Sequence, residues 1–295
     1  MTPFAFGVVS TGERDRRAWL DLARKAEGFG YGALYVTDHV HQPLAPFPAL
    51  AAAAAVTERL RLGPRVLNLA IRNTTLTAHE LTALDVLSDG RAELGIGAGW
   101  LRDDALATGG RLAPPGSRVQ RLVDAFGALD GLLRGEPVDG GEPFRTVQRP
   151  RPPITIGGAG PRLLTFAAQH ADLVSITGAS PTGDGLDEAD LSPERLDEKV
   201  GWIRRAAGAR AARPPLNHVV WECMVTPRPA QLLDAYAAAM GVAATRVQEL
   251  PALLIGSVEQ VAETLLARRE RWGLTSVAIP AQALEQFAPV IARLS

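Results

Sequence analysis

The pentapeptide 37–41, Thr-Asp-His-Val-His, follows the short apolar run Ala33–Val36 and combines side chains that proton transfer requires. In α/β barrels, polar residues at the carboxyl ends of buried strands carry the chemistry. His39 belongs to the side-chain type that exchanges a proton near neutral pH. Asp38 is an acceptor that we expect to orient the His39 imidazole. The structural alternative is that Asp38 caps the turn and His39 packs beneath a loop.

A second strand end is rich in glycine. The predicted strand Ala92–Ile96 runs into Gly97-Ala98-Gly99-Trp100. Glycines at 95, 97 and 99 would let a planar ligand approach the backbone, because no Cβ stands in the way. The pattern differs from the dinucleotide fingerprint, since Trp100 occupies the position of its last glycine. A tight strand–helix turn without a ligand is the alternative interpretation.

A third strand end predicts an anion site. Ile154–Ile156 leads into Gly157-Gly158-Ala159-Gly160, and a helix is expected to begin at Pro161. Free N–H groups and the positive end of the helix dipole bind anions at such a start. Proline in the first turn is preorganised for it. Arg162 would add positive charge or remain solvated, and a glycine-rich turn without a ligand is the alternative.

Strand-like and helix-like segments alternate along the chain. The expected strands are Phe4–Val9, Ala33–Val36, Leu60–Leu67, Ala92–Ile96, Ile154–Ile156, Leu173–Ile176, Val219–Val225 and Ser276–Ile279. The expected helices are Arg14–Phe29, Phe47–Val56, Leu76–Leu87, Ser117–Leu133, Pro161–His170, Glu194–Ala207, Val258–Trp272 and Leu284–Leu294. About eight strand–helix units predict an α/β fold of the (β/α)8 TIM-barrel type, with a doubly wound open sheet as the alternative.

Composition narrows the function classes. The 295 residues carry a net charge of −1, which gives no electrostatic reason to expect nucleic acid or an anionic membrane as partner. The single cysteine, Cys223, excludes an intrachain disulfide and a thiolate metal cluster, so a cytoplasmic location is expected. We find no secretory leader pattern and no apolar stretch long enough to span a membrane.

Residues 1–295 are expected to form one domain interrupted by a long loop. The segment 178–193 follows a predicted strand end and is rich in glycine, proline and aspartate. Loops of this length inside a compact domain are commonly lids or disordered. We expect 178–193 to be a lid or mobile loop over the site.

Five stretches carry a family resemblance. They are AEGFGYGALYVTDH (26–39), LRLGPRVLNLAIRN (60–73), ALDVLSDGRAELGIGAGW (83–100), PPITIGGAG (152–160) and LIGSVEQVAETLLARRERWG (254–273). In this order and spacing, over nearly the full length, the chain resembles the bacterial luciferase-like monooxygenase superfamily. Its members are FMN- or coenzyme F420-dependent oxidoreductases, and the resemblance implies a (β/α)8 barrel, commonly dimeric, with the cofactor at the carboxyl ends of the strands.

The resemblance also implies roles for particular residues. Asp38 and His39 would lie beside the flavin-type ring, and a peptide near Arg65-Val66, often cis in the family, would support the ring with Asn68 close by. The other implied cofactor contacts are Ala98 and Gly99 at the ring or ribityl chain, Asp103 at the same chain, and Gly157, Gly158, Ala159 and Gly160 at the phosphate. Trp100 stands where the deazaflavin sugar-phosphate dehydrogenases have a catalytic carboxylate, so that activity is not expected.

The leading hypothesis is an oxidoreductase that uses coenzyme F420 to transfer hydride to or from a small organic substrate, with His39 and Asp38 as catalytic residues. The alternative is an FMN-dependent monooxygenase that uses oxygen and a partner flavin reductase. A homodimer is expected in either case. A more distant alternative is a metal-dependent hydrolase with His39 and His41 as ligands and His218 as the third. A non-catalytic flavin-binding relative is the last alternative.

Overall fold

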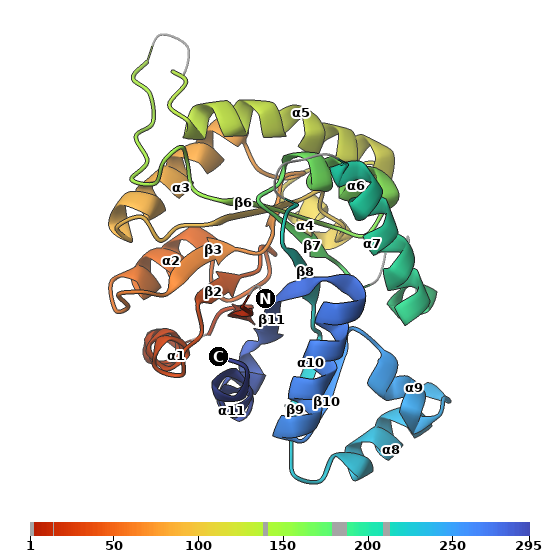
Figure 1. Cartoon of the computed structure of the whole chain (residues 1–295). Coiled ribbons are helices and arrows are strands. Elements are labelled where there is room, and N and C mark those ends of the chain that lie inside the picture. Colours follow the sequence, from red (N-terminus) through yellow and green to blue (C-terminus); the bar gives the residue numbers. More distant parts are fainter. Residues whose placement is uncertain (1–2, 14, 138–140, 179–187, 209–212) are drawn as a thin grey trace.

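The main sheet of the computed structural model is a parallel barrel (Figure 1). The model describes residues 3–13, 15–137, 141–178, 188–208 and 213–295. The strands of the main sheet are β1 (Ala5–Ser10), β2 (Ala33–Val36), β3 (Arg61–Pro64), β4 (Leu67–Asn68), β5 (Leu94–Gly97), β6 (Ile154–Gly158), β7 (Leu173–Ile176), β8 (Leu216–Val219) and β11 (Leu274–Pro280). Their order is β3-β2-β1-β11-β8-β7-β6-β5-β4.

The sheet closes through its two terminal strands. β3 pairs with β2, and β4 pairs with β5, so these two strands form the edges of the sheet. Along the chain, only a short irregular segment separates β3 from β4. A parallel bridge between Leu62 of β3 and Ala92, just before β5, joins the two edges. The predicted barrel is therefore confirmed, and the open doubly wound sheet is wrong.

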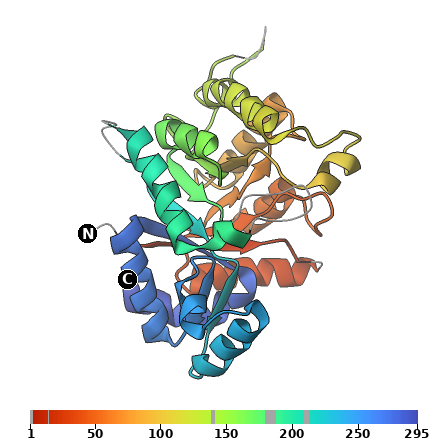
Figure 2. The same cartoon turned by 90° about the vertical axis from the view of Figure 1, so that its right-hand side faces the viewer.

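Helices surround the barrel (Figures 1 and 2). They are α1 (Arg16–Gly28), α2 (Pro46–Ala54), α3 (Thr74–Leu87), α4 (Arg102–Ala107), α5 (Pro115–Leu133), α6 (Pro161–His170), α7 (Pro193–Ala207), α10 (Val258–Trp272) and α11 (Leu284–Leu294). Local signals set their ends. Ser257 and Gln260 form a capping box at the start of α10, and Gly273 ends that helix in the left-handed conformation.

One unit outside the barrel was not predicted. Between β8 and β11 the chain forms β9 (Glu222–Val225), α8 (Pro229–Met240), α9 (Ala244–Glu249) and β10 (Leu253–Gly256), with β9 and β10 paired in parallel. The expected single strand Val219–Val225 is wrong, because the chain leaves the main sheet after β8. The backbone N–H of Trp221 then donates to the carbonyl of Ala252 rather than to a barrel strand.

A buried ion pair holds the chain at the carboxyl end of β7. Lys199 of α7 and Asp190 of the 3₁₀ turn η1 (Glu188–Leu191) lie 2.9 Å apart and are almost fully buried. The Lys199 ammonium also donates to the carbonyls of Thr177 and Gly178, both at 3.1 Å. Lys199 therefore ties β7 to η1.

Only part of the predicted lid 178–193 can be compared with the structure. Residues 179–187 lie outside the described part of the chain. In the described remainder, Glu188–Leu191 forms η1 and α7 begins at Pro193. A role of the segment as a lid stays a prediction. Within the described residues, no helix is both long and apolar enough to cross a membrane.

Candidate active site

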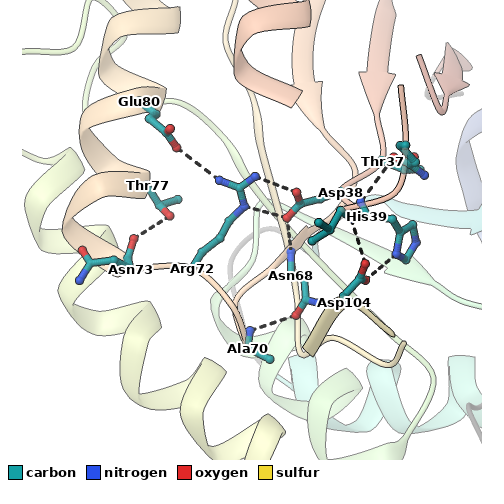
Figure 3. Close-up of polar contacts among 12 residues, drawn as sticks. Thr37, Asp38, His39, Asn68, Ala70, Arg72, Asn73, Thr77, Glu80 and Asp104 are labelled. Carbon is teal, nitrogen blue, oxygen red and sulfur yellow. Dashed lines mark hydrogen bonds and ion pairs between the residues drawn. The ribbon is translucent and has the colours of Figure 1, made fainter. Parts of the chain in front are cut away.

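The carboxyl ends of β2, β4, β5 and β6 bring the predicted site residues to one rim of the barrel. Parallel strands of a closed sheet all end on this side, which is why segments far apart in the sequence meet there. Asp38 and His39 follow β2, Asn68 ends β4, and Gly99 follows β5. Figure 3 shows the first three of these around Arg72 and Asp104.

Asp38 is held by an arginine rather than by the histidine beside it. Its two carboxylate oxygens accept from Nε and Nη2 of Arg72, each at 2.7 Å, and one oxygen also accepts from the backbone N–H of Asn68 at 2.9 Å (Figure 3). Although burial opposes it, bonding to Asp38 raises the pKa of Arg72. The expectation that Asp38 orients His39 is therefore wrong, because the Asp38 carboxylate is bonded to Arg72 and to the backbone of Asn68 instead.

His39 is oriented by Asp104 instead. The Nδ1 atom of His39 lies 2.7 Å from Oδ2 of Asp104, whose Oδ1 accepts from the backbone N–H of Val40 at 2.9 Å (Figure 3). The Asp104 side chain is fully buried, whereas 28% of the His39 side chain is exposed. A carboxylate accepts only, so Nδ1 carries the hydrogen and, in the neutral ring, Nε2 remains an acceptor.

Asp104 was not among the predicted site residues. Its neighbour Asp103, which the resemblance places at the ribityl chain, is exposed, whereas Asp104 is buried. Both lie in the short helix α4, where consecutive side chains point about 100° apart. The Asp103-Asp104 pair was a visible signal, but only the helical phase decides which carboxylate reaches His39.

The peptide bond between Arg65 and Val66 is cis, as the resemblance implied. Only the backbone of Arg65 reaches the rim, because its side chain turns into the barrel and stacks 3.8 Å above the Tyr35 ring. The Nε and Nη1 atoms of Arg65 are buried without a hydrogen-bond partner among the described residues.

The glycines of β5 make room for the protein itself rather than for a ligand. A Cβ at Gly97 would lie 2.6 Å from a Val66 methyl group, and one at Gly157 would lie 3.0 Å from the other. A Cβ at Gly95 would overlap the Pro64 carbonyl. These glycines let the β3–β4 step press against β5 and β6, so the interpretation that they accommodate a planar ligand is wrong for Gly95 and Gly97.

Gly99 has a related role beside Asn68. It adopts a φ of +74°, and a Cβ there would overlap the Asn68 amide. The same amide oxygen accepts from the backbone N–H of Ala70 at 3.0 Å. Asn68 is thereby locked between Asp38 and Gly99, and it fixes the spacing between the loops that follow β2 and β5.

Three further residues follow β2 and β5 along the chain: His41, Ala98 and Trp100. The Trp100 ring stands edge-on to the imidazole, with centroids 5.9 Å apart, and 41% of the residue is exposed. Ala98 is half-buried and packs against the barrel core. His41 is exposed on the loop beyond His39. Trp100 therefore gives His39 an apolar neighbour.

The start of α6 retains the features of an anion site, with the glycines in different roles. Gly158 is filled from within, because a Cβ there would lie 2.6 Å from a Leu163 methyl group. Gly160 precedes Pro161 in extended backbone, and a Cβ on it would meet nothing within 4 Å. The open approach to the first-turn N–H groups therefore passes Gly160, with Arg162 exposed beside it. This arrangement fits a phosphate.

The histidines do not form a metal site. His39 is committed to Asp104, and His218 is buried in β8 beside Gly178. Within the described ranges, no cluster of three His, Cys, Asp or Glu side chains has a geometry that could hold a metal ion. The donor set thus gives no support to the metal-dependent hydrolase.

His218 makes folding sensitive to acid. Burial, together with the charges of Arg268 and Lys199, lowers the pKa of His218 to about 3. The unfolded chain takes up this proton below about pH 6.5, whereas the folded protein does not, so stability falls as the pH drops from 6.5 toward 3. Between pH 7 and pH 4.5 the free energy of unfolding should fall by about 2.5 kcal/mol more in the wild type than in His218→Leu, as measured by urea unfolding. The exposed His41→Gln variant should keep the wild-type slope, and parallel curves for wild type and His218→Leu would refute this assignment.

Comparisons with known proteins identify a family and solved structures that share this fold. The family model for luciferase-like monooxygenases matches residues 1–187. The F420-dependent glucose-6-phosphate dehydrogenase of Microbacterium testaceum is 29% identical over 66% of this chain and 66% of its own. The coenzyme F420-dependent tetrahydromethanopterin reductase of Methanopyrus kandleri superposes with a TM-score of 0.76 at 16% identity, covering 100% of both chains. A type II Baeyer–Villiger monooxygenase of Pseudomonas putida, in complex with FMN, gives 0.75 at 16% identity over 99% of both.

The structure is a parallel α/β barrel with a histidine–carboxylate pair at the carboxyl ends of its strands. Because the family model covers more than half of the chain, the protein belongs to the luciferase-like monooxygenase family. The first curated relatives align over 61% and 59% of their own length. The solved structures are similar in fold alone at these identities.

Proposed function

We propose that the protein is an oxidoreductase that binds coenzyme F420 and transfers hydride to or from a small organic substrate. The observation that carries the proposal is the His39–Asp104 pair, which holds a partly exposed imidazole on the same barrel rim as the cis peptide and the start of α6. The bound deazaflavin would supply the hydride donor or acceptor, which the side chains of this chain cannot provide.

The residues of this chain would bind the cofactor and move the proton. Gly160 and the first turn of α6 would hold the phosphate, and the peptide Arg65-Val66 would support the ring. His39 would accept the hydroxyl proton when an alcohol is oxidised, or donate a proton to oxygen when a carbonyl is reduced. Asp104 stabilises the charged imidazole and keeps Nε2 directed at the rim. Trp100 favours an apolar substrate surface beside His39.

Turnover under argon tests this assignment. Purified protein is incubated with oxidised F420 and a panel of secondary alcohols, and with reduced F420 and the matching ketones or aldehydes. Bleaching or recovery of the deazaflavin absorbance, with stoichiometric product, supports hydride transfer. Oxygen-dependent product formation with reduced FMN alone would contradict the proposal.

FMN is the second candidate, because the cradle at Gly160 would accept its phosphate equally well. Reduced FMN activates oxygen for monooxygenation, and a partner flavin reductase would then be required to supply it. The Pseudomonas putida neighbour with bound FMN supports this option at the level of the fold. Oxygen uptake with a reductase and reduced FMN distinguishes it from the leading proposal.

Gly160 offers a selective test of the phosphate cradle. Replacement by valine places methyl groups in open space at the approach to the α6 N–H groups, so the fold should be retained and cofactor affinity should fall by about tenfold or more. Gly127→Val, with an equally open Cβ in the middle of α5, is the matched control. Fluorescence titration measures the cofactor affinity of both variants.

Gly158 is unsuitable for this test because its replacement would displace Leu163. Undiminished affinity in Gly160→Val would show that the phosphate binds elsewhere.

We propose further that residues 1–295 act as one barrel domain and associate as a homodimer in the cytoplasm. The outer face of α3 supports association, because Leu76, Val86 and Leu87 are more than half exposed. Glu80 on the same face is paired with Arg72, so two copies could meet without repulsion between free like charges. Light scattering should give twice the chain mass of 31.3 kDa, and the chain mass itself would refute the dimer.

A further inference from the structure

Several arginines near the start of α6 have no carboxylate partner among the described residues. The chain as a whole is almost neutral, with 31 basic and 32 acidic residues. The segments 105–123 and 143–171 contain several arginines and no Asp or Glu, although Arg145 and Arg151 pair with carboxylates outside these segments. These two segments include the amino-terminal half of α5 and all of α6, which the fold places side by side (Figure 1).

Three arginines from these helices surround the candidate site. Arg118 of α5 donates to the Gly99 carbonyl at 3.0 Å, and Arg121 donates to the Ala70 carbonyl at 2.9 Å. Arg162 of α6 donates to the Gly116 carbonyl at 3.4 Å and to the side chain of Gln120. Over the described part of the chain, none of the three forms an ion pair with a carboxylate.

Neutral acceptors position these cations without neutralising them. Arg118 is buried, and the loss of hydration lowers its pKa with no carboxylate to offset it. Arg121 and Arg162 are exposed at the surface, where their remaining N–H groups are open to a ligand. Guanidinium groups bind carboxylates and phosphates through paired hydrogen bonds. The cluster therefore has the charge and donor geometry to hold more negative charge than a single phosphate.

We propose that Arg121 and Arg162 form a second anion subsite, which takes the carboxylates of the coenzyme F420 tail beyond the phosphate. FMN ends at its phosphate, whereas F420 continues into a chain of carboxylates, so only F420 reaches both subsites. The inference rests on the proposed function and explains how one barrel rim prefers the deazaflavin. Arg118 positions Gly99 and contributes to the field from its buried site.

Equilibrium titration with three probes tests the subsite. The probes are F420, its form without glutamyl residues, and FMN, titrated into wild type, the double variant Arg121→Gln/Arg162→Gln and the control Arg228→Gln. Arg228 is exposed at the start of α8, in the unit outside the barrel. The double variant should bind F420 about tenfold more weakly, since two exposed ion pairs are lost. The loss of FMN affinity should be clearly smaller, because FMN can meet only Arg162, beside the phosphate, and has no tail to reach Arg121. The salt dependence of F420 binding should also become shallower.

The outcomes separate the two claims. Selective loss of F420 affinity supports the subsite. Equal loss for all three probes would place the arginines at the phosphate or in the fold, and unchanged F420 affinity would remove them from binding; either result overturns the inference. Failure of wild type to bind F420 at all would overturn the proposed function itself, which the subsite presupposes.

Discussion

Replacing His39 with glutamine is expected to lower turnover by about 10²- to 10⁴-fold while leaving cofactor affinity within about twofold of wild type. The glutamine amide can still donate to Asp104 and fill the same space, but it cannot exchange a proton at neutral pH. The loss should therefore appear in kcat rather than in KM. Steady-state kinetics with the best substrate of the alcohol and carbonyl panel, together with fluorescence titration of the cofactor, measure both quantities.

His41→Gln is the matched control, because His41 lies on the same loop and is exposed. It should retain turnover close to wild type. Asp104→Asn should fall between the two variants, since the imidazole keeps a hydrogen-bond partner but loses the carboxylate that stabilises its charged form. Wild-type turnover in His39→Gln would remove His39 from the mechanism.

Replacing Lys199 with methionine is expected to lower the free energy of unfolding by about 3 kcal/mol or more. Methionine has nearly the same shape, so the loss reports charge rather than a cavity. Asp190 would remain buried with Arg195, at 2.8 Å, as its remaining cation, and the carbonyls of Thr177 and Gly178 would lose a donor. Urea unfolding followed by circular dichroism measures the change.

Arg195→Gln separates the buried pair from its exposed neighbour. The Arg195 side chain is 40% exposed and contacts the same carboxylate, so its removal should cost less than about 1 kcal/mol. Equal costs for both variants would show that the buried Lys199 contributes no more to stability than its exposed neighbour Arg195. The size of the Lys199→Met effect thus measures how firmly β7 and η1 are joined.

The barrel was predictable because its strands are short, buried and apolar. Leu173–Ile176 and Ala33–Val36 match β7 and β2 residue for residue, and α6, α10 and α11 have the expected ends. The region after β8 could not be predicted in the same way. Val219–Val225 is apolar except for Glu222, so it was expected as one strand. Its departure from the barrel depends on tertiary pairing, namely the bond from Trp221 to Ala252 and the pairing of β9 with β10.

The location of the candidate site was easier to predict from the sequence than the hydrogen-bond partners of its residues. Strand ends pointed to Asp38, His39 and the glycine cradle, because parallel strands end at one rim. Asn68 came from the family resemblance alone. Sequence adjacency suggested that Asp38 orients His39. In the structure Asp38 pairs with Arg72, from the segment before α3, and His39 pairs with Asp104, from α4. The glycines of β5 likewise suggested a ligand, since no pattern reveals that Val66 fills their space.

Equilibrium titration of the purified protein with coenzyme F420 and with FMN, followed by fluorescence, tests the central claim most directly. The His39 rim, the cradle at Gly160 and the unbalanced arginines of α5 and α6 predict saturable one-to-one binding of F420 at least about tenfold tighter than that of FMN. Tighter binding of FMN, or binding of neither, would contradict the assignment of this chain as a deazaflavin enzyme.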